Sequence, residues 1–177
     1  LKKAANDPHP RVRLEAVRVA ANIRSKNLVP ISMQALDHPQ DRFLDYALWL
    51  SAWENRERWQ ADLAAKPRKA VFEEADHLTF ALLAIGSRDV IPQIVSLVQD
   101  GTLSIGRLGT AAQLIASQGS PADLGGFLAA ALNGKNDAGL RLEVLRILVN
   151  AARQRRAVPA GAERGLALLS ATQPNPT

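Results

Sequence analysis

Apolar residues along the chain recur with the 3.6-residue period of amphipathic helices, and no segment shows the strict alternation of a half-buried strand. In the first such segment, residues 10–24, the apolar face is predicted to hold Val12, Leu14 and Val17, while Arg13 points outward. Turn residues separate the later segments, with 66–69 as a loop. Ten helices are predicted, over residues 10–24, 28–36, 41–53, 56–65, 72–85, 89–98, 104–117, 121–132, 138–155 and 159–169. The chain is therefore predicted to be all-α.

A stretch near the N-terminus returns in altered form about one hairpin later. His9-Pro10 matches His38-Pro39 at an offset of 29, and Leu14 matches Leu44 at an offset of 30. The predicted helix pairs begin near residues 10, 41, 72, 104 and 138, so their spacing is 31 to 34 residues. Such a period is typical of stacked repeats, in which each hairpin buries its apolar face against its neighbours. We expect one repeat domain over residues 1–171, a linker-like tail over 172–177, and a chain that is part of a longer protein.

Several positions follow the pattern of a known repeat family. They are Asp7, Val12-Arg13, Ala16 and Ala20 in a first helix, residues 28–31 and 90–94 in second helices with a proline near the start, and Asp37 and Asp100-Gly101 in closing turns. This pattern resembles HEAT repeats over residues 1–55 and 85–101, and elsewhere only in period, because the Val-Arg pair is lost. The resemblance implies a right-handed α–α superhelix, a HEAT-like solenoid of about five helical hairpins.

Three longer segments resemble a more specific group of proteins. Residues 9–18, followed by 35–39 and 45–48, are similar to the HEAT segment of large exported bacterial proteins of the Planctomycetes and Verrucomicrobia. In those proteins the segment lies between a sugar-dehydrogenase-like β-propeller and a cytochrome c-type haem domain. The resemblance implies a spacer and docking module of a multidomain redox protein, with an exported or periplasmic location.

Composition limits the chemistry of this segment. The sequence has no cysteine, which excludes disulfides, thiolate metal sites, cysteine nucleophiles and the Cys-x-x-Cys-His haem motif within these residues. No apolar run approaches the roughly 20 residues that span a bilayer, so we expect no membrane insertion. The net charge of +5 is uneven: residues 1–30 carry +5, residues 138–177 carry +4 and residues 31–137 carry −4. Basic ends on an acidic middle differ from a continuous phosphate-binding track.

The three histidines do not predict a metal site. His9 and His38 occupy equivalent turns before a proline, where a structural role explains them. His77 follows Glu73 by four residues on one predicted helical face, which we interpret as a solvated face rather than as a metal pair. We predict no catalytic, cofactor-binding or metal-binding residues, and no cofactor.

Aromatic residues form the one cluster that suggests a binding surface. It comprises Trp49 and Trp53 on one predicted face, with Tyr46 nearby and with Arg56 and Trp59 at the start of the next helix. In the favoured interpretation, the large rings fill the wedge between adjacent hairpins. In the alternative, the cluster is a hot spot for a partner or a base-stacking platform.

Two functional hypotheses follow. The first is a non-catalytic scaffold or interdomain spacer that binds a protein partner or neighbouring domains of its own chain, with no enzymatic activity in this segment even where the parent protein is an oxidoreductase. The second is a HEAT-like nucleic-acid-binding protein or DNA glycosylase, a class that holds a damaged base with Trp, Asp and Arg in a basic groove. Five acidic residues near the tryptophans argue against the second because they repel phosphates: Asp41, Asp45, Glu54, Glu57 and Asp62. The oligomeric state is left open.

Overall fold

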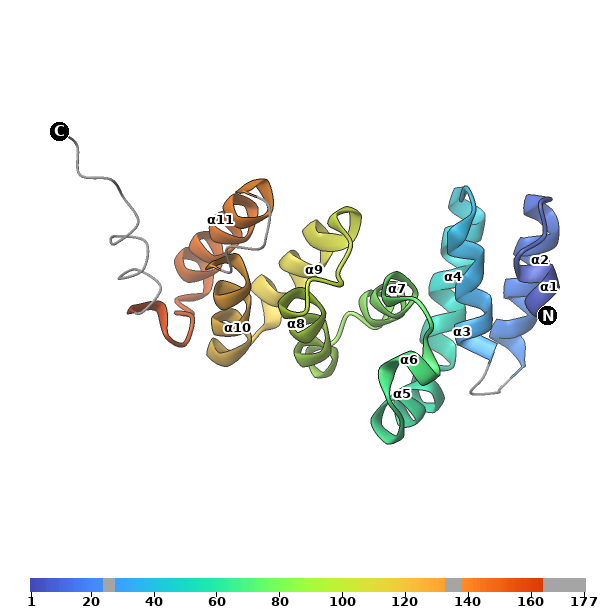
Figure 1. The fold of residues 1–177 in the computed structure, drawn as a ribbon, viewed down its shortest axis with the longest axis horizontal. Coiled ribbons are helices and arrows are strands. Elements are labelled where there is room, and N and C mark those ends of the chain that lie inside the picture. The colour runs from blue at the N-terminus through green and yellow to red at the C-terminus, as the bar shows by residue number, and fades with distance from the viewer. Residues whose placement is uncertain (24–27, 133–137, 164–177) are drawn as a thin grey trace. The chain divides into compact units, whose positions relative to one another are not determined.

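The computed structural model describes residues 1–23, 28–132 and 138–163, and within them it is all-helical (Figure 1). These residues form eleven α-helices and two 3₁₀ helices, and none of them lies in a strand. The all-α prediction is therefore confirmed. No helix of the described residues is long and apolar enough to cross a bilayer. The chain divides into two compact units, residues 1–86 and 87–177. The single repeat domain over residues 1–171 stays a prediction.

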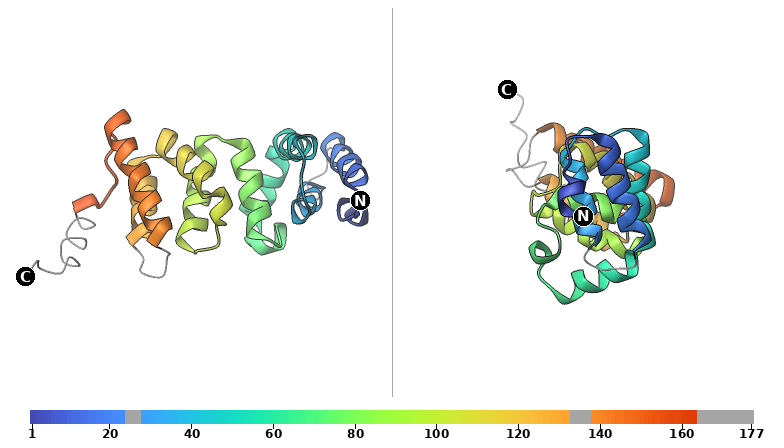
Figure 2. Two further views of the ribbon diagram at one scale, coloured as in Figure 1. Left: turned by 90° about the horizontal axis from the view of Figure 1, so that it is seen from above. Right: turned by 90° about the vertical axis from the view of Figure 1, so that its right-hand side faces the viewer.

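Unit 1 is built around three helices that lie next to one another. Its elements are α1 (Lys2–Ala5), α2 (Pro10–Asn22), α3 (Leu28–Met33), η1 (Gln34–Asp37), α4 (Arg42–Glu54), α5 (Arg56–Ala65), α6 (Arg68–Val71) and α7 (Ala75–Ile85). Helix α4 packs between α2 and α7, and α3 contacts all three of them from one side (Figures 1 and 2). Helices α2, α4 and α7 thus lie next to one another, and α3 packs against all three.

Unit 2 also consists of helices in its described residues. It contains η2 (Arg88–Val90), α8 (Ile91–Gln99), α9 (Ile105–Gln118), α10 (Pro121–Leu132) and α11 (Ala138–Arg155). Helix α10 contacts α8, α9 and α11, and these contacts enclose a core that includes Ile94, Leu97, Ile115, Leu124 and Phe127. Most of the helix predicted over 159–169, and the tail predicted over 172–177, lie outside the described residues.

Local hydrogen bonds explain why the starts of α4 and α10 could be predicted. Asp41 caps α4, and its Oδ1 accepts from the backbone N–H groups of Phe43 at 2.9 Å and Leu44 at 2.8 Å. The Oδ2 atom of Asp123 accepts from the Ser120 N–H at 2.8 Å, while the Asp123 N–H donates to Ser120 Oγ at 3.2 Å. These caps depend only on residues within one turn of the helix start.

Two predicted boundaries are wrong. Part of the loop predicted over residues 66–69 is helical, because α6 begins at Arg68. The helix predicted from Phe72 begins instead at Ala75. Phe72 is extended, with φ −120° and ψ 117°, and its buried ring packs edge-on against Trp59. A tertiary contact of this ring therefore overrides the local helical pattern.

The outward orientation predicted for Arg13 is also wrong. Its side chain is 3% exposed, and the guanidinium donates to the carbonyl oxygens of Asp7 at 2.8 Å, Pro8 at 3.0 Å and Pro39 at 3.0 Å. Three carbonyl acceptors compensate for the loss of hydration of the buried charge. Val12, predicted to be buried, is exposed instead.

Burial of Arg13 shows how the first two hairpins correspond. The buried positions Arg13, Ala16, Val17 and Ala20 of α2 match Leu44, Ala47, Leu48 and Ser51 of α4 at a constant offset of 31. The offset of 30 taken from Leu14 and Leu44 differs by one residue, because Leu14 is only half-buried. The offset of 31 compares equivalent positions of the two helices.

Candidate interaction surface

The surface side of α4 carries three of the predicted aromatic residues. Helix α4 buries Leu44, Ala47, Leu48, Ser51 and Ala52. Tyr46, Trp49 and Trp53 follow at spacings of three and four residues, which places them on the opposite side of the helix. Tyr46 is 61% exposed and Trp49 37% exposed. The interpretation that these rings fill the wedge between hairpins is therefore wrong for Tyr46 and Trp49.

These rings form a continuous stack. The ring centroids of Tyr46 and Trp49 are 5.9 Å apart with an interplanar angle of 18°, and those of Trp49 and Trp53 are 5.9 Å apart with an angle of 7°. The Arg56 guanidinium lies 4.4 Å from the centroid of Trp53, in a cation–π contact, and donates to the Trp53 carbonyl at 3.1 Å. We call Tyr46, Trp49, Trp53 and Arg56 the aromatic column.

Trp59 does not belong to the aromatic column. It is fully buried, and its Nε1 donates to the carbonyl oxygen of Ala52 at 2.9 Å. Its ring meets Phe72 edge-to-face at 5.6 Å and 84°. The sequence-based grouping of Trp59 with the other rings is corrected: Trp59 joins α5 to the core side of α4. The polar residues around it in α5 conceal this role in the sequence.

The neighbouring hairpin provides an internal comparison for the column. At the offset of 31, Tyr46, Trp49 and Trp53 correspond to Glu15, Arg18 and Asn22 of α2, all of which are exposed. The Arg18 guanidinium pairs with the Glu15 carboxylate at 3.0 Å, both being well solvated. Repeat packing therefore does not require aromatic side chains at these positions.

A groove between α2 and α4 borders the column. It has a volume of about 380 Å³, and its lining residues are Arg18, Ala21, Asn22, Ala47, Leu50 and Glu54. Leu50 follows Tyr46 by four residues and precedes Trp53 by three, so it adjoins both on the helix surface. The groove has small apolar residues between Arg18 on one side and Glu54 on the other. The sequence signal for this groove is the offset of 31, which identifies α2 and α4 as corresponding helices.

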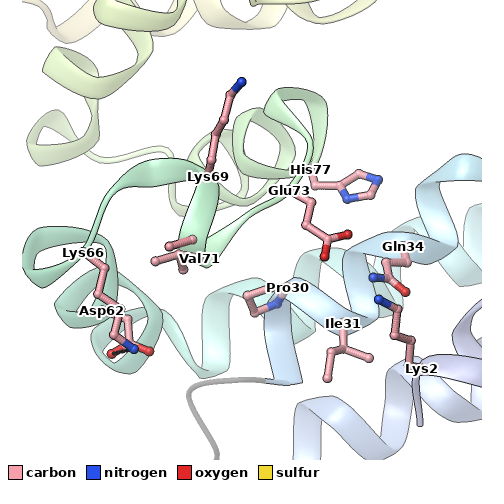
Figure 3. Close-up of a pocket in the computed structure, with 11 residues that line it drawn as sticks. Lys2, Pro30, Ile31, Gln34, Asp62, Lys66, Lys69, Val71, Glu73 and His77 are labelled. Atoms are coloured by element: carbon pink, nitrogen blue, oxygen red, sulfur yellow. Dashed lines mark ion pairs between the residues drawn. The ribbon is translucent and has the colours of Figure 1, made fainter.

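A second hollow, of about 350 Å³, opens in unit 1 among α1, α3, α5, α6 and α7 (Figure 3). Lys2, Lys66 and Lys69 line it together with Asp62 and Glu73, so charges of both signs meet there. Lys66 Nζ lies 3.5 Å from Asp62 Oδ1. Figure 3 shows the Glu73 carboxylate directed toward the hollow while the Lys69 ammonium points away from it. Because side chains of both charges line this hollow, its lining favours neither an anionic nor a cationic ligand.

His77, at the edge of this hollow, is not on a solvated face. It is buried, and its Nε2 lies 2.8 Å from Asp37 Oδ1, which joins α7 to η1. Glu73 precedes the start of α7, so the predicted pairing of Glu73 and His77 on one helical face is wrong. His9 caps α2, where its Nδ1 accepts from the Arg11 N–H at 3.3 Å. The described residues contain no group of three or more acidic, histidine or cysteine side chains that could hold a metal ion.

The geometry of the column limits what it can bind. Trp49 stacks with a ring on either side, and Arg56 covers one face of Trp53. Intercalation of a planar base between these rings would require the stack to open. Tyr46 and Trp49 expose aromatic surface on the helix that also lines the groove, and such surfaces are typical anchors of protein interfaces.

The chain was compared with models of protein families, with curated proteins and with solved structures, and none of these comparisons found a match.

Proposed function

We propose that this chain is a non-catalytic interaction and spacer module that binds a protein partner through the aromatic column. We propose further that its hairpins stack as a right-handed, HEAT-like superhelix of about five units. The observation that supports the binding role is the stack of exposed Tyr46 and Trp49 and half-buried Trp53 at positions that are polar in the preceding hairpin. The near-31-residue spacing supports the superhelix.

Residue chemistry favours a protein partner. Tyr, Trp and Arg are the residue types enriched among interface hot spots, and the column consists of these three types alone. Mutual stacking holds each ring in place before binding, so less side-chain entropy is lost when a partner covers them. The adjoining groove offers a small apolar floor at Ala21 and Ala47 for a partner side chain.

The same features argue against nucleic acid as the ligand. Single-stranded binders offer open ring faces for bases and cations for phosphates. Here the faces of Trp49 are taken up within the stack, and Asp45 and Glu54 lie on the same helix. Two carboxylates beside the column oppose the approach of a phosphate backbone.

In this proposal the chain contributes binding and spacing, while any redox chemistry belongs to other parts of the parent protein. If the parent protein has the architecture that the resemblance implies, the partner of the column is a neighbouring domain or a docking redox protein.

The test compares three proteins: the wild type, Trp49→Ser with Trp53→Ser, and a control with Arg11→Ala and Glu15→Ala on α2, two exposed residues that do not line the groove. Proteins captured by the immobilised chain from its source organism are identified, purified and titrated, with tryptophan fluorescence as the readout. We expect a partner whose Kd rises at least about 30-fold with the column variant, because hot-spot residues contribute about 2 kcal/mol or more. The control variant leaves that Kd unchanged.

Two outcomes would contradict the proposal. One is that no purified partner distinguishes the column variant from the control. The other is salt-sensitive binding of a labelled DNA duplex, measured by fluorescence anisotropy, that is lost in the column variant. The second result would replace the protein partner with nucleic acid.

A further inference from the structure

Helix α2 carries an exposed apolar stripe that the aromatic column does not include. Val12, Val19 and Ile23 are 39%, 45% and 51% exposed. Their spacing of seven and four residues places them on one side of α2. We call these three residues the α2 flank.

The α2 flank faces away from α4. The opposite side of α2 faces α4, because Arg18, Ala21 and Asn22 line the groove between the two helices. The Ala21 carbonyl also accepts a hydrogen bond of 3.2 Å from Asn55 Nδ2 at the end of α4. Helices α1 and α3 contact α2 as well, yet the flank stays exposed in their presence.

The repeat itself indicates what covers such a flank. At the offset of 31, Val12, Val19 and Ile23 correspond to Phe43, Leu50 and Glu54 of α4. Leu50 and Glu54 line the groove that faces α2. In the second hairpin, therefore, the positions of Leu50 and Glu54 face the first helix of the hairpin before it, while Phe43 is exposed. The equivalent positions of α2 face the place that a still earlier first helix would occupy.

We propose that the α2 flank binds the first helix of one further hairpin of the same repeat, covalently joined ahead of α2 and packed on it as α2 packs on α4. That helix would bring small residues against the flank, as α2 does with Ala21. This inference concerns a second surface and does not depend on the partner of the aromatic column.

The segment before α2 supports this occupant. Ala5 of α1 and Ala35 of η1 are both fully buried, and each precedes an aspartate by two residues, Asp7 and Asp37. Helix α1 contacts η1, and the Asn6 side chain donates to Gln34 Oε1 at 2.7 Å. Residues 1–7 thus resemble the end of a second helix, the part of a hairpin that connects it to the next one.

A joined hairpin fits better than a second copy of the chain. A stable interface between separate proteins buries about 1,200 Å² or more in total. Three half-exposed aliphatic side chains provide little of that area. A covalently joined hairpin needs only nearest-neighbour contacts, because its effective concentration is high.

The experiment inserts one extra hairpin. In a tandem chain, residues 1–36 are followed by residues 7–177, so that Leu36 is joined to Asp7 instead of Asp37. The second copy of α2, which we call the inner α2, then has the first copy of α2 ahead of it. Val19→Lys with Ile23→Lys is placed in the natural chain and in the inner copy of the tandem chain. Urea unfolding, followed by circular dichroism, gives the midpoint of each protein.

We expect the tandem chain to unfold at a higher urea concentration than the natural chain. The lysine substitutions should leave the midpoint of the natural chain unchanged, since the flank is exposed there, and lower that of the tandem chain by about 0.5 M or more. Glu15→Lys is the matched control, because it changes the charge by the same +2 on the solvated face and should leave both midpoints unchanged.

Equal sensitivity of the two chains to the lysine substitutions, or no gain in the tandem chain, would overturn the inference. So would dimerisation of the natural chain in sedimentation velocity that the flank substitutions abolish, because the occupant would then be a second copy. Each of these outcomes leaves the test of the aromatic column unaffected, since that test alters Trp49 and Trp53 only.

Discussion

The outer faces of α2 and α4 occupy corresponding positions of neighbouring hairpins, and they carry different chemistry. Glu15, Arg18 and Asn22 on α2 form a solvated face with one exposed ion pair, whereas α4 carries Tyr46, Trp49 and Trp53 in a stack. The buried positions of the two helices match at one constant offset. The difference teaches that packing constrains the inner positions of each hairpin and leaves the outer positions free for binding.

The comparison extends to α7. The five buried residues of α4 match the buried residues His77, Phe80, Ala81, Ala84 and Ile85 of α7 at an offset of 33, so His77 corresponds to Leu44 of α4 and, through the offset of 31, to Arg13 of α2. His77 is buried and hydrogen-bonded to Asp37. Arg13, Leu44 and His77 thus occupy corresponding inner positions, and the two polar members of this set each form a hydrogen bond to another segment, to Pro39 and to Asp37.

The largest expected effect separates the two kinds of tryptophan. Trp59→Ala removes a fully buried ring and the hydrogen bond to Ala52, and we expect it to lower the free energy of unfolding by about 3 to 5 kcal/mol. Trp49→Ala removes a partly exposed ring and should cost about 1 kcal/mol. Urea unfolding of both variants measures the difference, and equal losses would contradict the division into core and surface rings.

An intermediate effect is expected at His77. Substitution His77→Gln, Asp37→Asn and the two together form a double-mutant cycle across the 2.8 Å contact. We expect a coupling free energy of about 1 to 2 kcal/mol, since one partner is buried and the other is half-exposed. Urea unfolding at neutral pH gives the four values. A coupling near zero would mean that the contact does not hold α7 to η1.

The smallest expected effect per substituted residue comes from exchanging the two outer faces. Tyr46→Glu with Trp49→Arg and Trp53→Asn gives α4 the outer face of α2. We expect the free energy of unfolding to change by no more than about 1 kcal/mol beyond the loss of ring stacking, because surface positions contribute little to stability. The column-dependent binding should disappear. Collapse of the fold in this variant would show that the column is structural and that the comparison with α2 fails.

Local signals made the helices predictable. Pro10 in a first turn, Asp41 as a cap and the Ser120–Asp123 pair lie within a few residues of the helices they start. The exceptions have a tertiary cause. Phe72 is extended because its ring packs against Trp59, from a helix that precedes it in the chain.

The candidate site was only partly predictable for a related reason. Helical spacing put Trp49 and Trp53 on one face, and the structure stacks these two rings and adds Tyr46 to the stack. Spacing does not tell whether that face is inside or outside, because tryptophan suits both environments. Trp59 was grouped with them by proximity in the chain, although it belongs to the core.

The chain's own residues set the all-helical character, the hairpin period and most helix ends, because these depend on backbone hydrogen bonds and on contacts three or four residues apart. Burial of Arg13 and His77, the internal place of Trp59 and the exposure of the column depend on acceptors and surfaces contributed by distant segments, such as the Pro39 carbonyl and the Asp37 carboxylate. A buried polar group is stable only where such partners are present. Those partners come together only when the helices pack.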